Sequence, residues 1–511
     1  MSENTEAIGT DSEAQHIEES SGSTRQPTRP NERTDLTTGP ILKKMFIFAL
    51  PIIAGNVVMQ LYNVADSIIV GQFVGSDALA SVTASMPIMM LFNSLFTGFS
   101  MGANILIAQF RGASDYDAVE RSVNSTFALC LTMGTLITIL GILFSQPLLH
   151  LLGTPDNILS TSAAYLRVVY IGTIGNLLYM LCNGLARGMG DSQWPFYALC
   201  TSAVLNVLLD ILFVVVLGWS VPGVAAATAL SHIIAGSMMI YRFTKGKYGF
   251  NLTFAGLLKP DMNIIKSIVM LGLPSVIQNG ATSMGMMVTQ SFANSFGSNW
   301  IAANGIIQRV DGFAMMPMMG LGMSVTTFVA QNTGANQPER AKKGTLQVVT
   351  IMCIIGVIMG FVMYNSGYLL MRAFTSNERV LEMGNNGIRI IAFFYTFMGI
   401  NQAMSGAVRG AGEARVPAAI AIMSSLIRLP LAYFLAIVPM NNEINAAISA
   451  GTYATYELAK AAGIGMDNYT GLTRSMSYSM VISAATIFLY FVFGKWQNRG
   501  LVDKANRKQA S

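Results

Sequence analysis

The sequence predicts an all-α integral membrane protein with twelve transmembrane helices, arranged as two parallel-repeat six-helix bundles around a central cavity. Of its 511 residues, 52% are hydrophobic and only 11% are charged, against about 25% charged in soluble domains. Apolar runs of about 20 residues, the length that spans a bilayer as a helix, recur along the chain. An internal repeat relates its two halves, so each half should form one bundle.

The chain before the first apolar run, residues 1–40, is rich in Ser, Thr, Glu and Pro, which predicts a disordered cytoplasmic tail. The predicted spans of the first bundle (residues 41–247) are 45–70, 79–108, 122–145, 163–186, 196–217 and 222–243. After a cytoplasmic linker at 248–265, the second bundle (266–496) should contain 266–295, 302–330, 345–369, 385–408, 417–438 and 472–494. Residues 497–511 are expected to form a second cytoplasmic tail.

Basic residues indicate the orientation of the bundles. Lysines and arginines concentrate in alternate loops, as at Lys43–Lys44, Arg111, Arg187 and Arg340. Because positively charged loops stay in the cytoplasm, both termini should be cytoplasmic, and the protein should be a multi-pass protein of the cell membrane. The formal net charge of +5 is explained by these loops, so it does not predict nucleic-acid binding.

The internal repeat has an offset of about 222 residues. It pairs Ala108-Gln109 with Ala330-Gln331, and Gly112-Ala113 with Gly334-Ala335. An even number of spans in each half makes the two halves parallel, related by an axis along the membrane normal. About 28 extra residues at 442–469 interrupt the match, and we interpret them as an outer-loop insertion.

Isolated carboxylates in the first half mark the candidate functional site. Asp66 lies in an apolar run, and Asn206 and Asp210, four residues apart and therefore on one helix face, lie in another. An acid at a bilayer centre costs roughly 2.5–3.5 kcal/mol, so it usually faces an ion or substrate path. Two neighbouring carboxylates cannot both ionise at low cost. We expect a site for H⁺ or Na⁺; the alternative is a structural hydrogen-bonded cluster between helices.

Two duplicated motifs connect the chain to a known family. An Arg-Gly-x-Gly-Asp/Glu turn occurs at 187–191 and 409–413, and Ala-Gln-x-x-Gly-Ala at 108–113 and 330–335. With its twelve-span double repeat, the chain from 41 to 496 resembles the multidrug and toxic compound extrusion (MATE) transporters, most closely their DinF-like branch. The resemblance implies a first-half cation site at Asp66, Asn183, Asn206, Asp210 and Thr228.

The resemblance also implies a function. A transporter of this kind would be an H⁺- or Na⁺-coupled antiporter, exporting amphipathic, often cationic drugs by alternating access. It would work as a monomer in membrane lipid, without an organic cofactor, and any metal would be Na⁺ at Asp66 and Asp210. Without a nucleotide-binding motif, the energy for export should come from an ion gradient.

The second half departs from this pattern, because Arg428 matches Asn206 and Ala432 matches Asp210. This puts a second Na⁺ site in doubt. Candidates for a substrate cavity are Gln278, Asn279, Met287, Asp311, Met315 and Arg428. Asp311 either attracts a cationic substrate or pairs with Arg428. The methionines are either adaptable cavity walls or ordinary packing.

Other classes of function are less compatible with the sequence. A flippase for lipid-linked saccharides, with the same architecture, would need a strongly cationic cavity. An intramembrane enzyme would need clustered catalytic groups, and the chain shows no nucleophile with a base and no HExxH motif, so no catalytic residues are predicted. The four cysteines show no metal-binding spacing.

Overall fold

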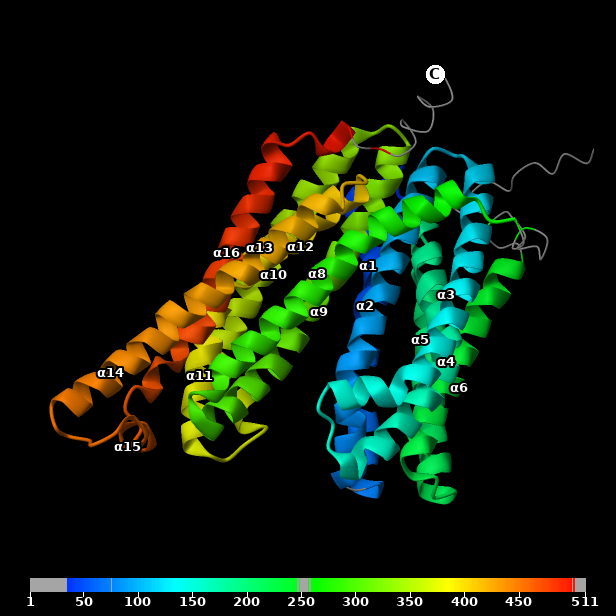
Figure 1. The fold of residues 1–511 in the computed structure, drawn as a ribbon. Coiled ribbons are helices and arrows are strands. Elements are labelled where there is room, and N and C mark those ends of the chain that lie inside the picture. The colour runs from blue at the N-terminus through cyan, green and yellow to red at the C-terminus, as the bar shows by residue number, and fades with distance from the viewer. Residues whose placement is uncertain are drawn as a thin grey trace, which may run out of the picture.

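The computed structural model describes residues 35–500, apart from 75, 246–247, 249–255, 257–258 and 499, and within this part all regular structure is helical (Figure 1). The first lobe contains α1 (Ile41–Phe73), α2 (Ser76–Gly112), α3 (Tyr116–Leu151), α4 (Asp156–Gly188), α5 (Gln193–Asp210), η1 (Ile211–Val216) and α6 (Ser220–Thr244). We call it the N-lobe. Its six spans are those that the sequence predicts, each somewhat longer than expected.

The second lobe, or C-lobe, follows the same plan with added elements. It contains α8 (Met262–Asn294), α9 (Gly297–Gly334), α10 (Pro338–Arg372), α11 (Glu378–Ala392), α12 (Tyr395–Gly410), α13 (Arg415–Ala432), η2 (Tyr433–Ile437), α14 (Val438–Ser449), α15 (Tyr456–Ala461), η3 (Met466–Tyr469), α16 (Thr470–Phe493) and η4 (Trp496–Asn498). Eleven segments in the described part of the chain are long and apolar enough to cross a membrane.

The predicted span at 385–408, the tenth along the chain, is the one crossing absent from these eleven segments, because its helix is broken. The helix stops at Ala392 and restarts at Tyr395, so the two pieces, α11 and α12, are each too short to span a bilayer alone. No Pro or Gly lies at the break, which spans Phe393 and Phe394. The expectation of one continuous helix was therefore wrong, while the expectation of twelve crossings is confirmed when α11 and α12 are taken together.

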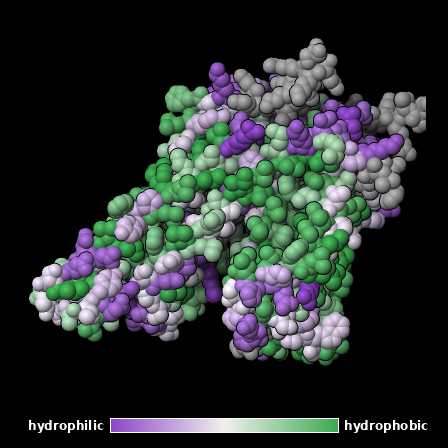
Figure 2. All heavy atoms as spheres, in the orientation of Figure 1, coloured by the Kyte–Doolittle hydropathy of each residue, from purple (hydrophilic) through white to green (hydrophobic). Residues whose placement is uncertain are grey.

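The two lobes meet at one end and diverge at the other. In Figure 1 they converge at the top, near the start of α1 and the ends of α2, α4 and α9, and separate toward the bottom. We call these ends the closed face and the open face. Figure 2 shows an apolar band around the middle of both lobes, hydrophilic residues at either end, and a wedge-shaped opening between the lobes at the open face. An apolar band of this kind is what a bilayer requires.

Helix α1 belongs to both lobes. Near its start, Met45, Phe48 and Ala49 are buried in a core formed with α9, α10 and α12 of the C-lobe. Its second half packs against α5 of the N-lobe. Pro51 lies between these two parts and removes one helical hydrogen-bond donor, which favours bending at this point. A movement of one lobe relative to the other would therefore act on α1, as it would on α8, whose residues Ile264, Ile268 and Leu271 lie in the N-lobe core.

The residues just before α1 are ordered, which differs from the predicted disordered tail at 35–40. Leu36 is 1% exposed and lies in the same C-lobe core. Its backbone N donates to Gln331 Oε1 at 3.0 Å, and its carbonyl accepts from Asn332 Nδ2 at 3.3 Å. These contacts lie on the far lobe, nearly 300 residues away in sequence, so local composition could not reveal them. The rest of that predicted tail, 1–34, and residues 501–511 lie outside the described residues.

The insertion at 442–469 is helical and folds back on the open face of the C-lobe. Tyr456 donates to Asn441 Oδ1 at 2.8 Å, and Arg379 pairs with Asp467 at 2.8 Å. The ring of Tyr469 lies 4.6 Å from that of Trp300 at the start of α9. In Figure 1, α14 and α15 project beyond the other helices at the lower left. The insertion therefore covers one end of the C-lobe.

The repeat is retained in detail around α5 and α13. Asp210 is the last residue of α5 and Ala432 the last of α13, and each is followed by a short π-helix. Such π segments are rare and often occur at functional sites. The two lobes thus share one backbone arrangement, but only the N-lobe has a carboxylate there.

Candidate functional site

The structure brings the two predicted carboxylates together inside the N-lobe. Asp210 is fully buried at the end of α5, and Asp66 is half-buried on α1. Their carboxyl groups lie within hydrogen-bonding distance of each other. Asp66 Oδ1 and Asp210 Oδ1 are buried and have no hydrogen-bond partner among the described residues. Two carboxyl groups in such contact cannot both carry a full charge at low cost unless a cation lies between them.

Neutral polar groups complete this cluster. In the orientation that satisfies both ends of its amide, Asn206 donates to Asp210 Oδ2 at 2.8 Å and accepts from the backbone N of Thr228 at 3.2 Å. The opposite orientation would turn its oxygen toward acceptors only. Thr228, on α6, also hydrogen-bonds with Tyr62. The cluster therefore joins α1, α5 and α6 through Tyr62, Asp66, Asn206, Asp210 and Thr228.

Tyr62 is the member of the cluster that sequence reasoning missed. It precedes Asp66 by four residues, so both side chains lie on one face of α1. A Tyr one turn from an isolated acid was a usable signal, although a Tyr in an apolar span is also common as packing. Tyr165 of α4, which is 4% exposed, lies close enough to Asp66 and Asp210 to interact with their charges.

Asn183 is not brought into the cluster. It lies one turn beyond Tyr179 toward the closed face, and its side chain makes no hydrogen bond to a described residue. A small cavity of about 20 Å³, enough for one water, lies beside Tyr62, and Asn183 does not line it. The cavity is lined by Met59, Tyr62, Asn176, Tyr179, Met180, Leu199, Ser202, Ala203, Ser231 and His232. On α4 the amide that reaches this space is therefore Asn176.

The donor set fits a proton or a small hard cation. It offers two carboxylates, an amide oxygen and hydroxyl groups, all oxygen ligands of the kind that Na⁺-like cations prefer. Among the described residues, no group of three or more His, Cys, Asp or Glu side chains could hold a metal ion. A cation at this site would therefore depend on Asp66 and Asp210 together with neutral oxygens.

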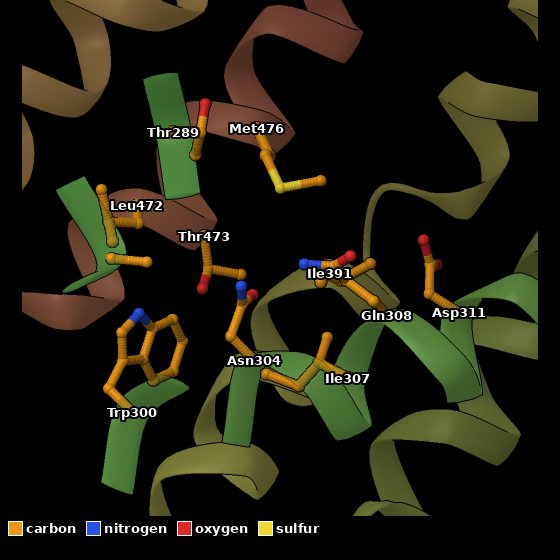
Figure 3. Close-up of a pocket in the computed structure, with 11 residues that line it drawn as sticks. Thr289, Trp300, Asn304, Ile307, Gln308, Asp311, Ile391, Leu472, Thr473 and Met476 are labelled. Atoms are coloured by element: carbon orange, nitrogen blue, oxygen red, sulfur yellow. The ribbon is translucent and has the colours of Figure 1, made fainter. Parts of the chain in front are cut away.

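The C-lobe has its own enclosed cavity of about 30 Å³ (Figure 3). It is lined by Thr289, Ala293, Trp300, Asn304, Ile307, Gln308, Asp311, Ile391, Leu472, Thr473 and Met476. Asp311 hydrogen-bonds with Tyr395, so of the two predicted alternatives the pairing with Arg428 is not formed. The polar residues Asn304, Gln308 and Thr473 were not predicted, because none of them is charged and no repeat partner marks them.

The other predicted cavity residues do not line this space. Gln278 and Asn279 are half-buried on α8, Met287 is 71% exposed, and Met315 packs against the C-lobe core. Arg428 is buried at 8% exposure on α13. The predicted set therefore has no common location, and Asp311 is its only member on the wall of this cavity.

The sequence matches a known family over most of its helices. A family model described as MatE matches residues 51–212 and 274–434, one stretch in each lobe. The chain is 29% identical over 402 residues to the "Probable multidrug resistance protein YoeA" of Bacillus subtilis (strain 168), covering 77% of this chain and 87% of YoeA. It is 27% identical to "Probable multidrug resistance protein YpnP" of the same organism, covering 91% of this chain and 97% of YpnP.

Solved structures share the fold. A structure described as "MATE in complex with MaL6" superposes with a TM-score of 0.80 at 22% identity, covering 90% of this chain and 98% of that one. A transporter of the MOP superfamily from Pyrococcus furiosus gives a TM-score of 0.78 at 23% identity, covering 91% and 98%. Together with the family match in both lobes and the shared double repeat, these likenesses show that the chain belongs to the MatE family of multidrug efflux transporters.

Proposed function

We propose that this protein exports amphipathic, often cationic small molecules by alternating access, in exchange for H⁺ or Na⁺ bound at Asp66 and Asp210. The observation that carries the proposal is the contact between these two carboxyl groups, one on α1 and one on α5. Its support from relatives is the description of YoeA and YpnP as probable multidrug resistance proteins.

The orientation follows from the basic residues. Lys43, Lys44, Arg111, Arg340 and Arg415 lie at the ends of helices on the closed face. With positively charged loops inside the cell, the closed face is cytoplasmic, the termini lie in the cytoplasm and the opening between the lobes faces outward. The arrangement then corresponds to the state that releases substrate.

Helix α1 supplies the coupling between ion and conformation. Its first half is part of the C-lobe core, and its second half carries Tyr62 and Asp66 to the N-lobe site. An ion that joins Asp66 to Asp210 fixes α1 against α5, and its departure frees α1 to bend near Pro51. The ion biases the conformational equilibrium only by its differential affinity for the two states. A membrane potential supplies about 2.3 kcal/mol per charge per 100 mV.

The test is uptake or efflux of a fluorescent organic cation in proteoliposomes, under an imposed pH gradient or an imposed Na⁺ gradient. Asp66→Asn and Asp210→Asn should each abolish transport driven by the coupling ion. Glu382→Gln is the control, because it neutralises an acid of the other lobe that lies outside both of the cavities described above. Equal transport by wild type, Asp66→Asn and Asp210→Asn would refute the carboxylate mechanism, and the gradient that drives wild type identifies the ion.

A further inference from the structure

A surface pocket of about 280 Å³ lies at the break between α11 and α12 of the C-lobe. Two arginines line it, Arg389 of α11 and Arg474 of α16. The other residues that line it are Tyr364, Ile390, Phe393, Phe394 and Tyr478. Among the described residues no acidic side chain lines this pocket, so its walls carry two positive charges and no negative one. We call it the arginine pocket.

The helix break forms two walls of the arginine pocket. The ring of Phe393 lies 5.5 Å from that of Tyr364 on α10, and the ring of Phe394 lies 6.2 Å from that of Tyr478 on α16. The two residues of the break therefore turn their rings toward different neighbouring helices. The guanidinium of Arg389 lies 5.0 Å from the centre of the Tyr364 ring, which fixes its position on one wall.

Neither Arg389 nor Arg474 has an acidic partner in the part of the chain that the structure describes. The ion pairs there join Arg242 to Asp191, and Arg379 to Glu382 and Asp467. Both arginines of the pocket are exposed. On a surface that faces lipid, an exposed guanidinium loses water without gaining a counter-charge, so it requires an anion from outside the protein.

The arginine pocket lies on a side of the C-lobe that faces lipid. Figure 1 shows α16 on the side of the C-lobe that is turned away from the N-lobe. On α10, Val357 and Phe361 share one helix face with Tyr364, and they are 63% and 72% exposed. At the break, Phe393 is 69% exposed. Large apolar side chains exposed in this way on spanning helices indicate contact with acyl chains.

The length of α10 places the arginine pocket at the level of the lipid headgroups. This helix has 35 residues and is about 50 Å long, whereas the hydrocarbon core of a bilayer is about 30 Å thick. A centred helix therefore extends about 10 Å beyond the core at each end. Tyr364 lies about 12 Å before the end of α10 at Arg372. Tyrosines concentrate at this level of a membrane.

We propose that the arginine pocket binds the headgroup of an anionic phospholipid from the leaflet at the open face. The guanidinium groups of Arg389 and Arg474 donate to the phosphate oxygens, and the acyl chains lie along the exposed apolar face of α10. Basic pockets between transmembrane helices bind anionic headgroups in this way. The volume of about 280 Å³ is below the roughly 300–1,000 Å³ of pockets for drug-sized molecules. This lipid site is separate from the ion site of the N-lobe.

The experiment is a titration of the delipidated full-length protein in detergent with phosphatidylglycerol, phosphatidylethanolamine or glycerol 3-phosphate, with bound molecules counted by native mass spectrometry. Wild type should bind phosphatidylglycerol at least tenfold more tightly than either other probe. Arg389→Gln and Arg474→Gln should each weaken the tightest phosphatidylglycerol site about fivefold, as expected for one lost charge at a membrane surface. Arg372→Gln is the matched control, because Arg372 is an exposed arginine at the same end of α10 that does not line the pocket.

The three probes separate a lipid from other sources of phosphate. Equal binding of phosphatidylethanolamine would show that the net charge of the headgroup is not recognised, and equal binding of glycerol 3-phosphate would show a site for soluble phosphate. Either result overturns the proposal. It is also overturned if both glutamine variants bind phosphatidylglycerol as wild type does, or if Arg372→Gln weakens binding as much as they do.

A second measurement locates the lipid on wild type, without relying on the folding of any variant. A photoactivatable phosphatidylglycerol should crosslink to α10, α11, α12 or α16 around the arginine pocket. Crosslinks to other helices alone would overturn the proposal. Since no transport is measured, failure of ion coupling in the proteoliposome test leaves both results unaffected.

Discussion

Gln109 and Gln331 make the same hydrogen bond in opposite directions across the closed face. Gln109 Nε2, on α2 of the N-lobe, donates to the carbonyl of Gly410 in the C-lobe at 2.9 Å. Gln331 Nε2, on α9 of the C-lobe, donates to the carbonyl of Gly188 in the N-lobe at 2.9 Å. Both glutamines are buried, and the pair follows the internal repeat. The closed face is therefore held by two symmetric hydrogen bonds between the lobes, which we call the polar locks.

Removal of either lock should favour opening of the closed face. Each of Gln109→Ala and Gln331→Ala loses one buried hydrogen bond between the lobes, worth about 1 kcal/mol, and so should shift the equilibrium about fivefold toward the inward-open state. Gln331→Ala also loses the hydrogen bond from the Leu36 backbone N, which lies within the C-lobe side of this face. Labelling of an introduced cysteine near Gly188 with a water-soluble maleimide measures the shift. Gln337→Ala, at the same face with no side-chain hydrogen bond to a described residue, should label as wild type does. Unchanged labelling in both lock variants would contradict the prediction.

Glycines make the close approach behind these locks possible. A Cβ on Gly112 would collide with the carbonyl oxygen of Gln331, and a Cβ on Gly334 with that of Gln109. Because both obstacles are backbone atoms, side-chain rotation cannot relieve the collision. We expect Gly112→Ala and Gly334→Ala to exclude the closed arrangement and to abolish transport while the protein still folds.

The matched control for the glycines is Gly280→Ala on α8, where a Cβ would meet nothing within 4 Å. Alanine favours helix over glycine by about 1 kcal/mol, so this variant should be as stable as wild type or slightly more stable. Interlobe distances from spin labels across the closed face report the result. If Gly334→Ala keeps the interlobe distances of wild type, the closed arrangement does not require the close contact of α2 and α9 at this glycine.

Asp191 should contribute to stability, because it joins three segments at the closed face. Its Oδ2 accepts from Arg242 and from Tyr248, both at 3.0 Å. Its Oδ1 accepts from the backbone N of Gln193 and of Trp194, both at 3.1 Å. Asp191→Ala removes the carboxylate that accepts all four of these hydrogen bonds and should lower the free energy of unfolding by about 3 kcal/mol. A denaturation titration in mixed SDS micelles measures this loss.

The control for Asp191 is Glu382→Ala. Glu382 pairs with Arg379 at 3.2 Å, but its side chain is 62% exposed. Exposed pairs contribute about 0–1 kcal/mol, so this variant should unfold nearly as wild type does. If both variants lose the same free energy of unfolding, the hydrogen bonds of Asp191 contribute no more to stability than an exposed ion pair does. The four hydrogen bonds that Asp191 accepts thus give the Arg-Gly-x-Gly-Asp turn a part in stabilising the fold.

The sequence was sufficient for features that depend on composition and spacing. Span positions follow from apolar runs, the two-lobe plan follows from the repeat, and the Asp66–Asp210 contact follows from the cost of isolated acids in lipid. It was insufficient where tertiary packing decides. The break at Phe393–Phe394 has no local signal, and the order at Leu36 depends on contacts with the other lobe. On α4, Asn176 and Asn183 are seven residues apart and share one helix face, so the choice between them depends on depth along the helix.

Residues 35–40, just before α1, should stabilise the closed face. We call this segment the latch, and Asp35 fixes its turn. Asp35 Oδ1 accepts from the backbone N and the hydroxyl of Thr37 at 2.8 and 2.6 Å, which fixes a turn. This turn presents the Leu36 N to Gln331, the residue that also forms one of the polar locks. Asp35→Asn should loosen the turn, so amide hydrogen exchange of residues 36–39 should become faster.

The pH dependence of the latch follows from its electrostatics. Burial acts to raise the pKa of Asp35, but hydrogen bonds from Thr37 and Thr38, together with the charge of Lys44, hold it below the usual 3.8. A carboxyl group with a lowered pKa stabilises the folded state at any pH above its unfolded value and loses this effect only as the pH falls through the folded value. Between pH 5 and 8, the protection of residues 36–39 should therefore be constant after correction for intrinsic exchange rates. Asp115→Asn, which affects the cap of α3 at the same face, should leave it unchanged. Protection that falls between pH 8 and 5 would show that a group other than Asp35 controls the latch.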